Sequence, residues 1–524
     1  MHRHNFTSLV LGGVLFLSSF LIPVDAYAQA YGKDESGTYR MTDGTPIENV
    51  YARGIDVSHW KQEIDWNAVA ADDVSFVMLG TRYQGDVDPY YRINAEGAHA
   101  AGIQLGAYIY YYATTPEMAS QEADFVLDLV KDYPISYPIA FDVEDNGTLG
   151  NLTPSQVSDI INAFCSKIED AGYYPLVYAN DNWLANKIDM SQVPYDVWVA
   201  RYGKKPAYSD PVMWQATSTG AISGVNGSTD IDFQFTDFSG LIPDSLWRTI
   251  GDTTYFYKNY TMQKNTWADD QGTWYFFDQN GQPKKGWFLS GTDYYYLDNS
   301  TGAMKTGWLD LDGSWYYLNG SGQMQTGWNQ INSFWYYLNQ SGQMQTGWLK
   351  DGNETYYLGS SGAMKTGWSN IGNYWYFFNP AGQMQTRWVC PDGNWYYLDQ
   401  EGKMQTGWLK LNGIWYYLTS SGQMATGLTE VSGNRYYLNG SGAMETGMIT
   451  IDGKSYYFDP ASGGAMAVNR TVMIDGISYL AGTDGVLTVQ ETKAPAETGA
   501  PSEETAETAE TVEPSSQSVG PGAF

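Results

Sequence analysis

The sequence of 524 residues is poor in cysteine and histidine. Its two cysteines, Cys165 and Cys390, fall in regions that differ in composition and indicate different domains, which excludes a disulfide framework. It has four histidines, two of them within the first four residues, which argues against a metal site of cysteine and histidine ligands. We therefore expect neither a structural metal nor a cofactor.

Basic residues are also scarce, with 28 Lys and Arg against 58 Asp and Glu and a formal net charge of −30. This balance argues against nucleic acid as a partner, because binding phosphates requires clustered cations. Residues 9–22 are apolar, follow a weakly basic start and precede Ala26-Tyr27-Ala28, which fits a small-x-small cleavage site, a pattern typical of a secretory signal peptide at 1–28. A membrane anchor is the alternative, but the run is short for a span. We expect a secreted, extracellular protein whose mature form has no membrane span.

After a polar lead-in at 29–50, strand-like and helix-like segments alternate up to about residue 240. Helical patterns occupy 95–101, 116–131 and 153–171, and strand-like segments are 54–58, 75–79, 105–112, 139–145, 175–178, 197–200 and 212–215. The alternation predicts an α/β domain at 51–245, either a (β/α) barrel or a related parallel sheet. Helical patterns are sparse in its later part, so we expect the barrel to be distorted. Residues 246–260 read as a connector.

The texture then changes to a repeat of about 20 residues over 261–490. Each unit has a Gly-Trp pair, an aromatic triplet such as WYY at 315–317, a turn and a Met. Aromatic strands around turn residues such as Asp312-Gly313 predict β-hairpins, and single hairpins are marginal in water, so the units must stack as an all-β solenoid. The acidic tail at 491–524 is rich in Glu, Thr, Ala, Pro and Ser and is expected to be disordered.

Three groups of acids are predicted to lie at strand ends: Asp56, then Asp142 with Glu144, then Asp230 with Asp232. A barrel brings the ends of distant strands together at one mouth. Several carboxylates among aromatic residues suit glycoside hydrolysis, in which one carboxyl is kept protonated as the acid and negative charge stabilises the transition state. The alternatives are acids that cap a loop, or a Mg²⁺ or Ca²⁺ site, although no loop has the spacing of calcium ligands.

Several motifs resemble glycoside hydrolase family 25, the cell-wall lysozymes or N-acetylmuramidases. They are GIDVSHW at 54–60, FDVED at 141–145, WVARY at 198–202, WQ at 214–215 and GSTDID at 227–232, in the family's order. The resemblance implies a distorted (β/α) barrel and a secreted enzyme that cleaves the β-1,4 bond between N-acetylmuramic acid and N-acetylglucosamine in peptidoglycan. It also implies retention of configuration, assisted either by an aspartate or by the acetamido group of the substrate.

The resemblance also assigns roles to residues. Glu144 is implied as general acid/base, Asp142 as the group that orients or stabilises the sugar, and Asp56 as the floor of the cleft. Asp230 matches the last family aspartate, with Asp232 as its rival. Segment 81–85, TRYQG, departs from the Ala-Thr-Glu-Gly of many members and so lacks one acid. The expected sugar contacts are Tyr108 and Trp214, followed by Tyr178, Trp198, Tyr110 and Tyr112.

The repeats resemble the choline-binding, or cell-wall-binding, repeats of bacterial surface hydrolases and toxins. A site is expected from the Gly-Trp tryptophan, the Trp of the next triplet and a Tyr one repeat further on, because three aromatic faces suit a quaternary ammonium or a sugar ring. The implied partners are peptidoglycan and choline-bearing teichoic acid or another wall glycan. The candidates are Trp308, Trp315, Trp328, Trp335, Trp348, Trp388, Trp395, Trp408 and Trp415.

Some repeats lack these aromatics. Thr355, Arg435 and Ser455 replace the first aromatic of the triplet, and Leu428 and Met448 replace the Gly-Trp tryptophan, so those units are expected to serve structure or capping. The competing hypothesis for the whole chain is a catalytically silent adhesion protein that binds surface carbohydrate or choline.

Overall fold

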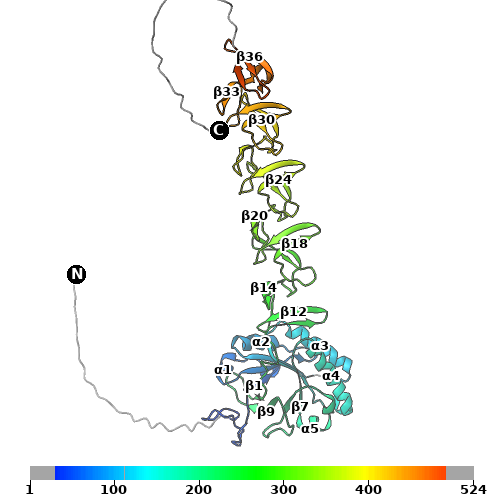
Figure 1. Cartoon of the computed structure of the whole chain (residues 1–524). Coiled ribbons are helices and arrows are strands. Elements are labelled where there is room, and N and C mark those ends of the chain that lie inside the picture. Colours follow the sequence, from blue (N-terminus) through cyan, green and yellow to red (C-terminus); the bar gives the residue numbers. More distant parts are fainter. Residues whose placement is uncertain (1–29, 111–112, 491–524) are drawn as a thin grey trace, which may run out of the picture. The chain divides into compact units, whose positions relative to one another are not determined.

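The computed structural model describes residues 30–110 and 113–490 (Figure 1). They divide into two compact units: one runs up to residue 288 and includes 296–304, and the other holds 289–295 and the chain from 305 onward. The predicted signal peptide, the acidic tail and Tyr112 lie outside the described residues. None of the helices in the described part of the chain is long and apolar enough to span a lipid bilayer.

The first unit is built around a closed barrel of eight strands in the order β1-β10-β9-β8-β7-β6-β5-β2. The strands are β1 (Ala52–Val57), β2 (Phe76–Gly80), β5 (Gln104–Tyr110), β6 (Ile135–Asp142), β7 (Pro175–Asn180), β8 (Val197–Ala200), β9 (Met213–Gly220) and β10 (Thr229–Gln234). Neighbouring strands are parallel except at β10, which is antiparallel to both β1 and β9. The barrel is therefore closed but irregular.

Five helices accompany the barrel: α1 (Trp66–Ala71), α2 (Tyr91–Ala100), α3 (Pro116–Val130), α4 (Pro154–Asp170) and α5 (Asp181–Asn186). Helix α4 begins as its sequence predicts, because Thr153 and Gln156 form a reciprocal capping box and Pro154 occupies the first turn. After α5 the described chain, which runs to residue 490, contains no further α-helix. The sparse helix in the second half of the domain is thus confirmed.

Alternation along the strands creates two layers of core. Outward residues such as Ile55, Phe141 and Trp214 belong to the larger cluster, which also holds the buried faces of α2, α3 and α4. Inward residues such as Phe76 and Trp198 fill the barrel. Below its mouth, the barrel is therefore filled with apolar and aromatic side chains that exclude water. A charged group placed there loses hydration, which disfavours its ionised form.

Residues 246–260, which the sequence suggested to be a connector, form most of a sheet of three strands, β11 (Leu246–Ile250), β12 (Thr253–Lys258) and β13 (Thr261–Met262). Arg248 is fully buried, with its guanidinium 4.0 Å from the ring centroid of Tyr173 and 4.5 Å from that of Tyr257. The hydroxyl of Tyr257 also donates to the carbonyl of Lys131, at 2.8 Å. This sheet therefore packs on the barrel domain as part of its fold.

Replacing Arg248 with Ala should lower the free energy of unfolding of the first unit by about 2–4 kcal/mol, because it removes two cation–π contacts and leaves a cavity. Thermal unfolding of the full chain, followed by calorimetry, measures the change. Thr249→Ala is the control, since Thr249 is the exposed neighbour on the same strand. A transition unchanged in Arg248→Ala would contradict this account of the sheet.

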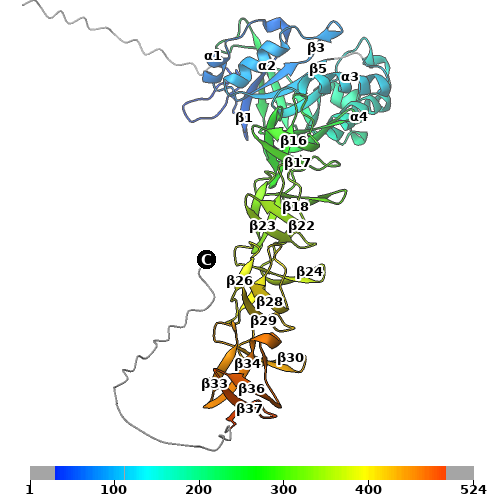
Figure 2. The same ribbon diagram turned by 90° about the horizontal axis from the view of Figure 1, so that it is seen from above.

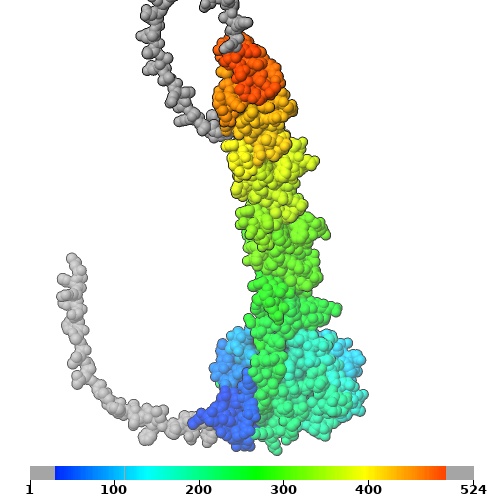
Figure 3. Space-filling view, in the orientation of Figure 1, coloured from blue at the N-terminus to red at the C-terminus, as the bar shows by residue number. Residues whose placement is uncertain are grey.

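From residue 266 onward the chain forms successive hairpins, as the repeat predicts (Figures 1 and 2). Asp312 and Gly313 both have positive φ, 51° and 83°, so the turn of the β18–β19 hairpin has the conformation expected of type I′. Consecutive repeats pack on one another: the amide of Met344 donates to the carbonyl of Trp315 in the preceding repeat, at 2.7 Å. Some hairpins protrude from the surface of the second unit (Figure 3).

The hairpin strands are β14 (Thr266–Asp270), β15 (Thr273–Phe277), β16 (Gly286–Ser290), β17 (Asp293–Leu297), β18 (Gly307–Leu311), β19 (Ser314–Leu318), β20 (Gly327–Ile331), β21 (Phe334–Leu338), β22 (Gly347–Asp351), β23 (Glu354–Leu358), β24 (Gly367–Ile371), β25 (Tyr374–Phe378), β26 (Arg387–Val389), β27 (Tyr396–Leu398), β28 (Gly407–Leu411) and β29 (Ile414–Leu418). Three-stranded sheets follow: β30 (Gly427–Val431), β31 (Asn434–Leu438) and β32 (Met444–Glu445); β33 (Gly447–Ile451), β34 (Lys454–Asp459) and β35 (Ala465–Met466); β36 (Arg470–Ile474), β37 (Ile477–Ala481) and β38 (Leu487–Val489).

Candidate active site

The barrel gathers the acids that the sequence singled out. Asp56 lies near the end of β1 and is directly opposite Asp230 at the start of β10. Asp142 is the last residue of β6, and Glu144 follows two residues later in the loop, so the strand predicted over 139–145 starts earlier and ends before Glu144. Asp232 is two residues further along β10 than Asp230.

Burial makes these acids hard to ionise. Asp56, Asp142 and Asp232 are 7%, 6% and 0% exposed. Loss of hydration raises the pKa of each well above its usual range, and repulsion between neighbouring carboxylates raises them further. Burial also raises the pKa of Asp230, which the Lys61 ammonium opposes. The group as a whole binds protons more tightly than free carboxyls do.

Glu144 and its neighbour Asp145 have opposite electrostatic environments. Partial burial raises the pKa of Glu144, and a weak bond from Asn180 Nδ2 to Oε2, at 3.4 Å, opposes that rise. The pKa of Asp145 is lowered, because its Oδ2 accepts bonds of 2.7 Å from both the hydroxyl and the amide of Thr148. Glu144 thus keeps its proton to higher pH than a free glutamic acid does, whereas Asp145 loses its proton more readily than a free aspartic acid.

Gln215 connects the acids to aromatic side chains. Its Nε2 donates to Asp56 Oδ2 at 2.6 Å, and its Oε1 accepts from the hydroxyls of Tyr178, at 2.8 Å, and Tyr202, at 2.7 Å. The sequence singled out this glutamine only as part of a motif, because nothing in one sequence shows which strand residue faces the barrel interior. The WQ pair at 214–215, read with period two, does place these two side chains on opposite faces.

The structure corrects the placement of three predicted sugar contacts. Trp214 is 1% exposed and lies in the outer core, where its Nε1 donates to the carbonyl of Arg201, so it faces away from the acids. Trp198 faces inward but is also 1% exposed, and its Nε1 donates to Asp232 Oδ1 at 2.9 Å. Tyr178, 5% exposed, stacks edge-on against Trp198. Trp198 and Tyr178 support the acids from behind, because neither leaves a ring face open to a sugar.

A pocket of about 740 Å³ opens at this mouth of the barrel. It is lined by Asp142, by Tyr108 and Tyr110, and by residues of the 58–60 and 80–85 segments. Tyr108 and Tyr110 therefore remain candidates for substrate contact. Within residues 30–110 and 113–490, no group of three or more His, Cys, Asp or Glu side chains is arranged to hold a metal ion.

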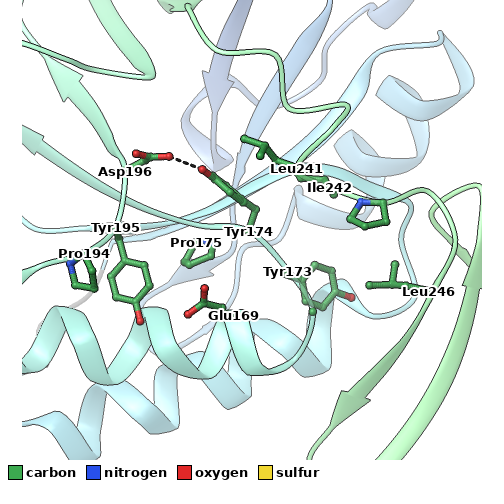
Figure 4. A pocket seen from close by; sticks show the side chains of 12 residues that line it. Glu169, Tyr173, Tyr174, Pro175, Pro194, Tyr195, Asp196, Leu241, Ile242 and Leu246 are labelled. Atoms are coloured by element: carbon green, nitrogen blue, oxygen red, sulfur yellow. Dashed lines mark hydrogen bonds between the residues drawn. The ribbon is translucent and has the colours of Figure 1, made fainter.

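The pocket in Figure 4 lies elsewhere on the first unit. Its lining includes Pro175, the first residue of β7, and Asp196, just before β8. In Figure 4 Tyr174 points toward Asp196, to which its hydroxyl donates. Because β6, β7 and β8 are parallel, this pocket lies at the opposite strand ends from Asp142 and includes none of the five acids.

The repeats form the three-ring clusters that their spacing predicts. The Trp308 ring lies 6.3 Å from that of Trp315 and 4.9 Å from that of Tyr336, one repeat further on. The same cluster recurs at Trp388, Trp395 and Tyr416, and at Trp408, Trp415 and Tyr436. Trp328 and Trp348 likewise meet Tyr356 and Tyr376.

One cluster was absent from the candidates drawn from the sequence. The Trp368 ring lies 6.5 Å from that of Trp375 and 4.8 Å from that of Tyr396. Its spacing along the chain equals that of the other clusters, so the repeat register alone would have identified it. Trp375 is 45% exposed, comparable to 42% for Trp315, which leaves its ring face open to a ligand.

Known protein families match both the barrel domain and the repeats. Residues 55–225 match the model of glycosyl hydrolases family 25. Models of a choline-binding repeat match 325–367, 365–401, 388–427 and 425–470, and that of a cell wall binding repeat matches 265–282 and 306–324.

Individual relatives cover only parts of the chain. The autolytic lysozyme of Clostridium acetobutylicum is 27% identical over 183 residues, which are 34% of this chain and 55% of that protein. Lysozyme M1 of Streptomyces globisporus is 25% identical over 204 residues, which are 35% of this chain and 68% of that protein. The structure of CbpJ from Streptococcus pneumoniae is 32% identical and covers 47% of this chain and 100% of that one, with a TM-score of 0.34. The chain thus contains a domain of glycosyl hydrolases family 25, at residues 55–225, followed by choline-binding and cell wall binding repeats.

Proposed function

We propose that the protein is a secreted peptidoglycan hydrolase that cleaves the β-1,4 bond between N-acetylmuramic acid and N-acetylglucosamine. The observation that carries the proposal is the position of Glu144. It is a half-buried carboxyl with a raised pKa, placed just beyond the strand that ends in Asp142 at the mouth of the barrel. The family and the lysozymes among the relatives support the same chemistry.

The reaction begins with the proton that Glu144 retains. Glu144 donates it to the oxygen of the scissile bond, and the departing sugar leaves an oxocarbenium-like centre. Asp142, Asp56 and Asp230 at the mouth share their protons, and the negative charge that the group keeps stabilises that centre. The assisting nucleophile bonds to C1 as the first sugar leaves; Glu144 then takes a proton from water, whose oxygen attacks C1 and breaks that bond. We expect retention of configuration, with an aspartate or the acetamido group of the substrate as the assisting nucleophile.

Digestion of purified peptidoglycan tests the bond assignment. The products are reduced with borohydride and the newly reduced sugar is identified by chromatography. New N-acetylmuramic acid ends are expected. New N-acetylglucosamine ends, or no cleavage, would refute the proposal, and the second result would favour the silent adhesion protein.

Replacing Asn180 with Asp should move the alkaline limb of the kcat/KM profile to higher pH by about half to one unit. The general acid must be protonated, and a second carboxylate beside Glu144 raises its pKa further, so the protonated form persists to higher pH. Asp preserves the cap of α5, since Asn180 Oδ1 accepts from the amides of Asn182 and Trp183. A limb that stays fixed, or moves to lower pH, would argue against Glu144 as the acid.

We further propose that the repeats hold the enzyme on choline-bearing teichoic acid or another wall glycan. The clusters that carry this proposal are those formed by Trp308, Trp368, Trp388 and Trp408 with their partner rings. Binding to a choline-mimicking resin distinguishes the two ligands. Elution of the protein by free choline supports choline as the ligand, whereas failure to bind the resin supports another wall glycan.

Trp408→Ala should remove one choline site, lowering the stoichiometry measured by titration calorimetry by one and leaving the other sites unchanged. The reason is that Trp408 contacts both other rings of its cluster, Trp415 and Tyr436. Leu428→Ala is the matched control, because Leu428 holds the same position in the next repeat without an aromatic ring. Equal stoichiometry in wild type and Trp408→Ala would show that this cluster is structural.

A further inference from the structure

The segment in which the sequence departs from its family builds a distinct edge of the cleft. Residues 82–87 form a small hairpin of β3 (Arg82–Tyr83) and β4 (Asp86–Val87). Its two turn residues, Gln84 and Gly85, both have positive φ, 51° and 93°, as a tight type I′ turn requires. We call this hairpin, together with residues 58–60, the aromatic lip.

The lip is anchored firmly at its base. Thr81 is fully buried, and both its amide and its hydroxyl donate to the carbonyl of Tyr108, each at 2.9 Å. Arg82 pairs with Glu122 of α3 at 2.7 Å and lies over the ring of Phe125 at 4.2 Å. The hairpin is therefore held between the mouth of the barrel and a helix, and the charge of Arg82 is neutralised.

Three aromatic rings contact one another in a tilted arrangement on this base. The His59 ring lies 3.7 Å from that of Tyr83 and 4.5 Å from that of Trp60. The buried carboxylate of Asp88 fixes His59, accepting from its amide at 2.8 Å and lying 3.0 Å from Nδ1. The outermost ring, Trp60, is 75% exposed, although it lines the same pocket as Asp142.

The Trp60 indole is exposed beside the acids, its neighbours are fixed, and the charge of Arg82 is neutralised. Such a ring is suited to bind the apolar face of an uncharged sugar ring. We infer that the aromatic lip is a sugar-binding subsite. In it, Trp60 binds one uncharged pyranose of the glycan strand, next to the two sugars whose bond is cleaved beside Asp142 and Glu144. This inference rests on the proposed function. It assigns to TRYQG a role in recognition in place of the missing acid.

The affinity of the inactive Glu144→Gln protein for two ligands tests the inference without catalysis. One is the peptide-free tetrasaccharide of N-acetylglucosamine, and the other is a peptidoglycan tetrasaccharide that bears stem peptides. Titration calorimetry is done with the repeats saturated by free choline. Adding Trp60→Ala should weaken both ligands about tenfold, and Trp60→Phe should restore most of the loss because a ring remains.

Two further measurements sharpen the test. In the active protein, Trp60→Ala should raise KM about tenfold with kcat within about twofold, since the ring contacts substrate away from the bond that breaks. Tyr51→Ala is the control, because Tyr51 is an exposed aromatic just before the opposite end of β1.

Unchanged affinity for both ligands in Trp60→Ala would overturn the inference, and so would a loss restricted to the peptide-bearing ligand, which would make the lip a peptide site. Absence of hydrolysis by the wild-type chain would instead refute the proposed function, and the calorimetric comparison would still decide the role of the lip.

Discussion

Glu144→Gln should reduce the rate of peptidoglycan cleavage by about 10³-fold or more, with the fold and wall binding intact. An amide cannot supply the proton that the leaving oxygen needs, and general acid catalysis alone contributes up to about 10⁴-fold. The substitution preserves shape and the contact with Asn180. Release of soluble fragments from purified walls measures the rate, and thermal unfolding checks the fold.

Asp145→Asn is the matched control for Glu144→Gln. Asp145 is the next residue in the chain, but its bonds to Thr148 lower its pKa and commit it to the loop. The variant should keep its activity within about threefold, because an Asn oxygen can still accept from Thr148. If both variants lose activity equally, the loop conformation and not the proton on Glu144 would be the requirement.

Gln215→Leu should lower kcat about 10- to 100-fold and also destabilise the first unit. It removes the donor to Asp56 and the shared acceptor of the Tyr178 and Tyr202 hydroxyls, leaving buried polar groups without partners at about 1–3 kcal/mol each. Asp56, freed from its 2.6 Å contact, would no longer be oriented toward the mouth. Steady-state kinetics and chemical denaturation separate the two effects.

Gln234→Leu provides the comparison. Gln234 is equally buried in β10 and accepts from the hydroxyl of Tyr137 at 2.7 Å, but it pairs with Ala52 at the opposite end of the barrel. It should lose comparable stability while kcat stays within about threefold. A similar loss of kcat in both variants would mean that Gln215 acts through the fold and has no specific effect on Asp56.

The alternating segments and motif order of the sequence predict much of this arrangement, including α4 with its cap, the hairpin at Asp312-Gly313 and the gathering of Asp56, Asp142 and Asp230. The direction of β10 was beyond such reasoning. In a parallel barrel the carboxyl end of each strand carries the site, yet Asp230 lies at the start of β10 and reaches the mouth because that strand is antiparallel.

The wrong placement of Trp214 has a physical origin. Both faces of a barrel strand are buried, one against helices and one inside the barrel, so an apolar residue gives no sign of its side. Trp214 packs in the outer layer, between strand and helices, whereas its neighbour Gln215 points into the barrel and contacts Asp56. The role of segment 81–85 depends on contacts with His59 and Glu122, which are distant in the sequence and become visible only in the folded chain.

The most direct test of the account is digestion of purified peptidoglycan in H₂¹⁸O, followed by mass spectrometry of the fragments. If Glu144 is the general acid of a muramidase, each new N-acetylmuramic acid end carries one ¹⁸O atom at C1 with the wild-type chain, and no end is labelled above background with Glu144→Gln. Label on N-acetylglucosamine ends, or equal labelling by the two proteins, would contradict it.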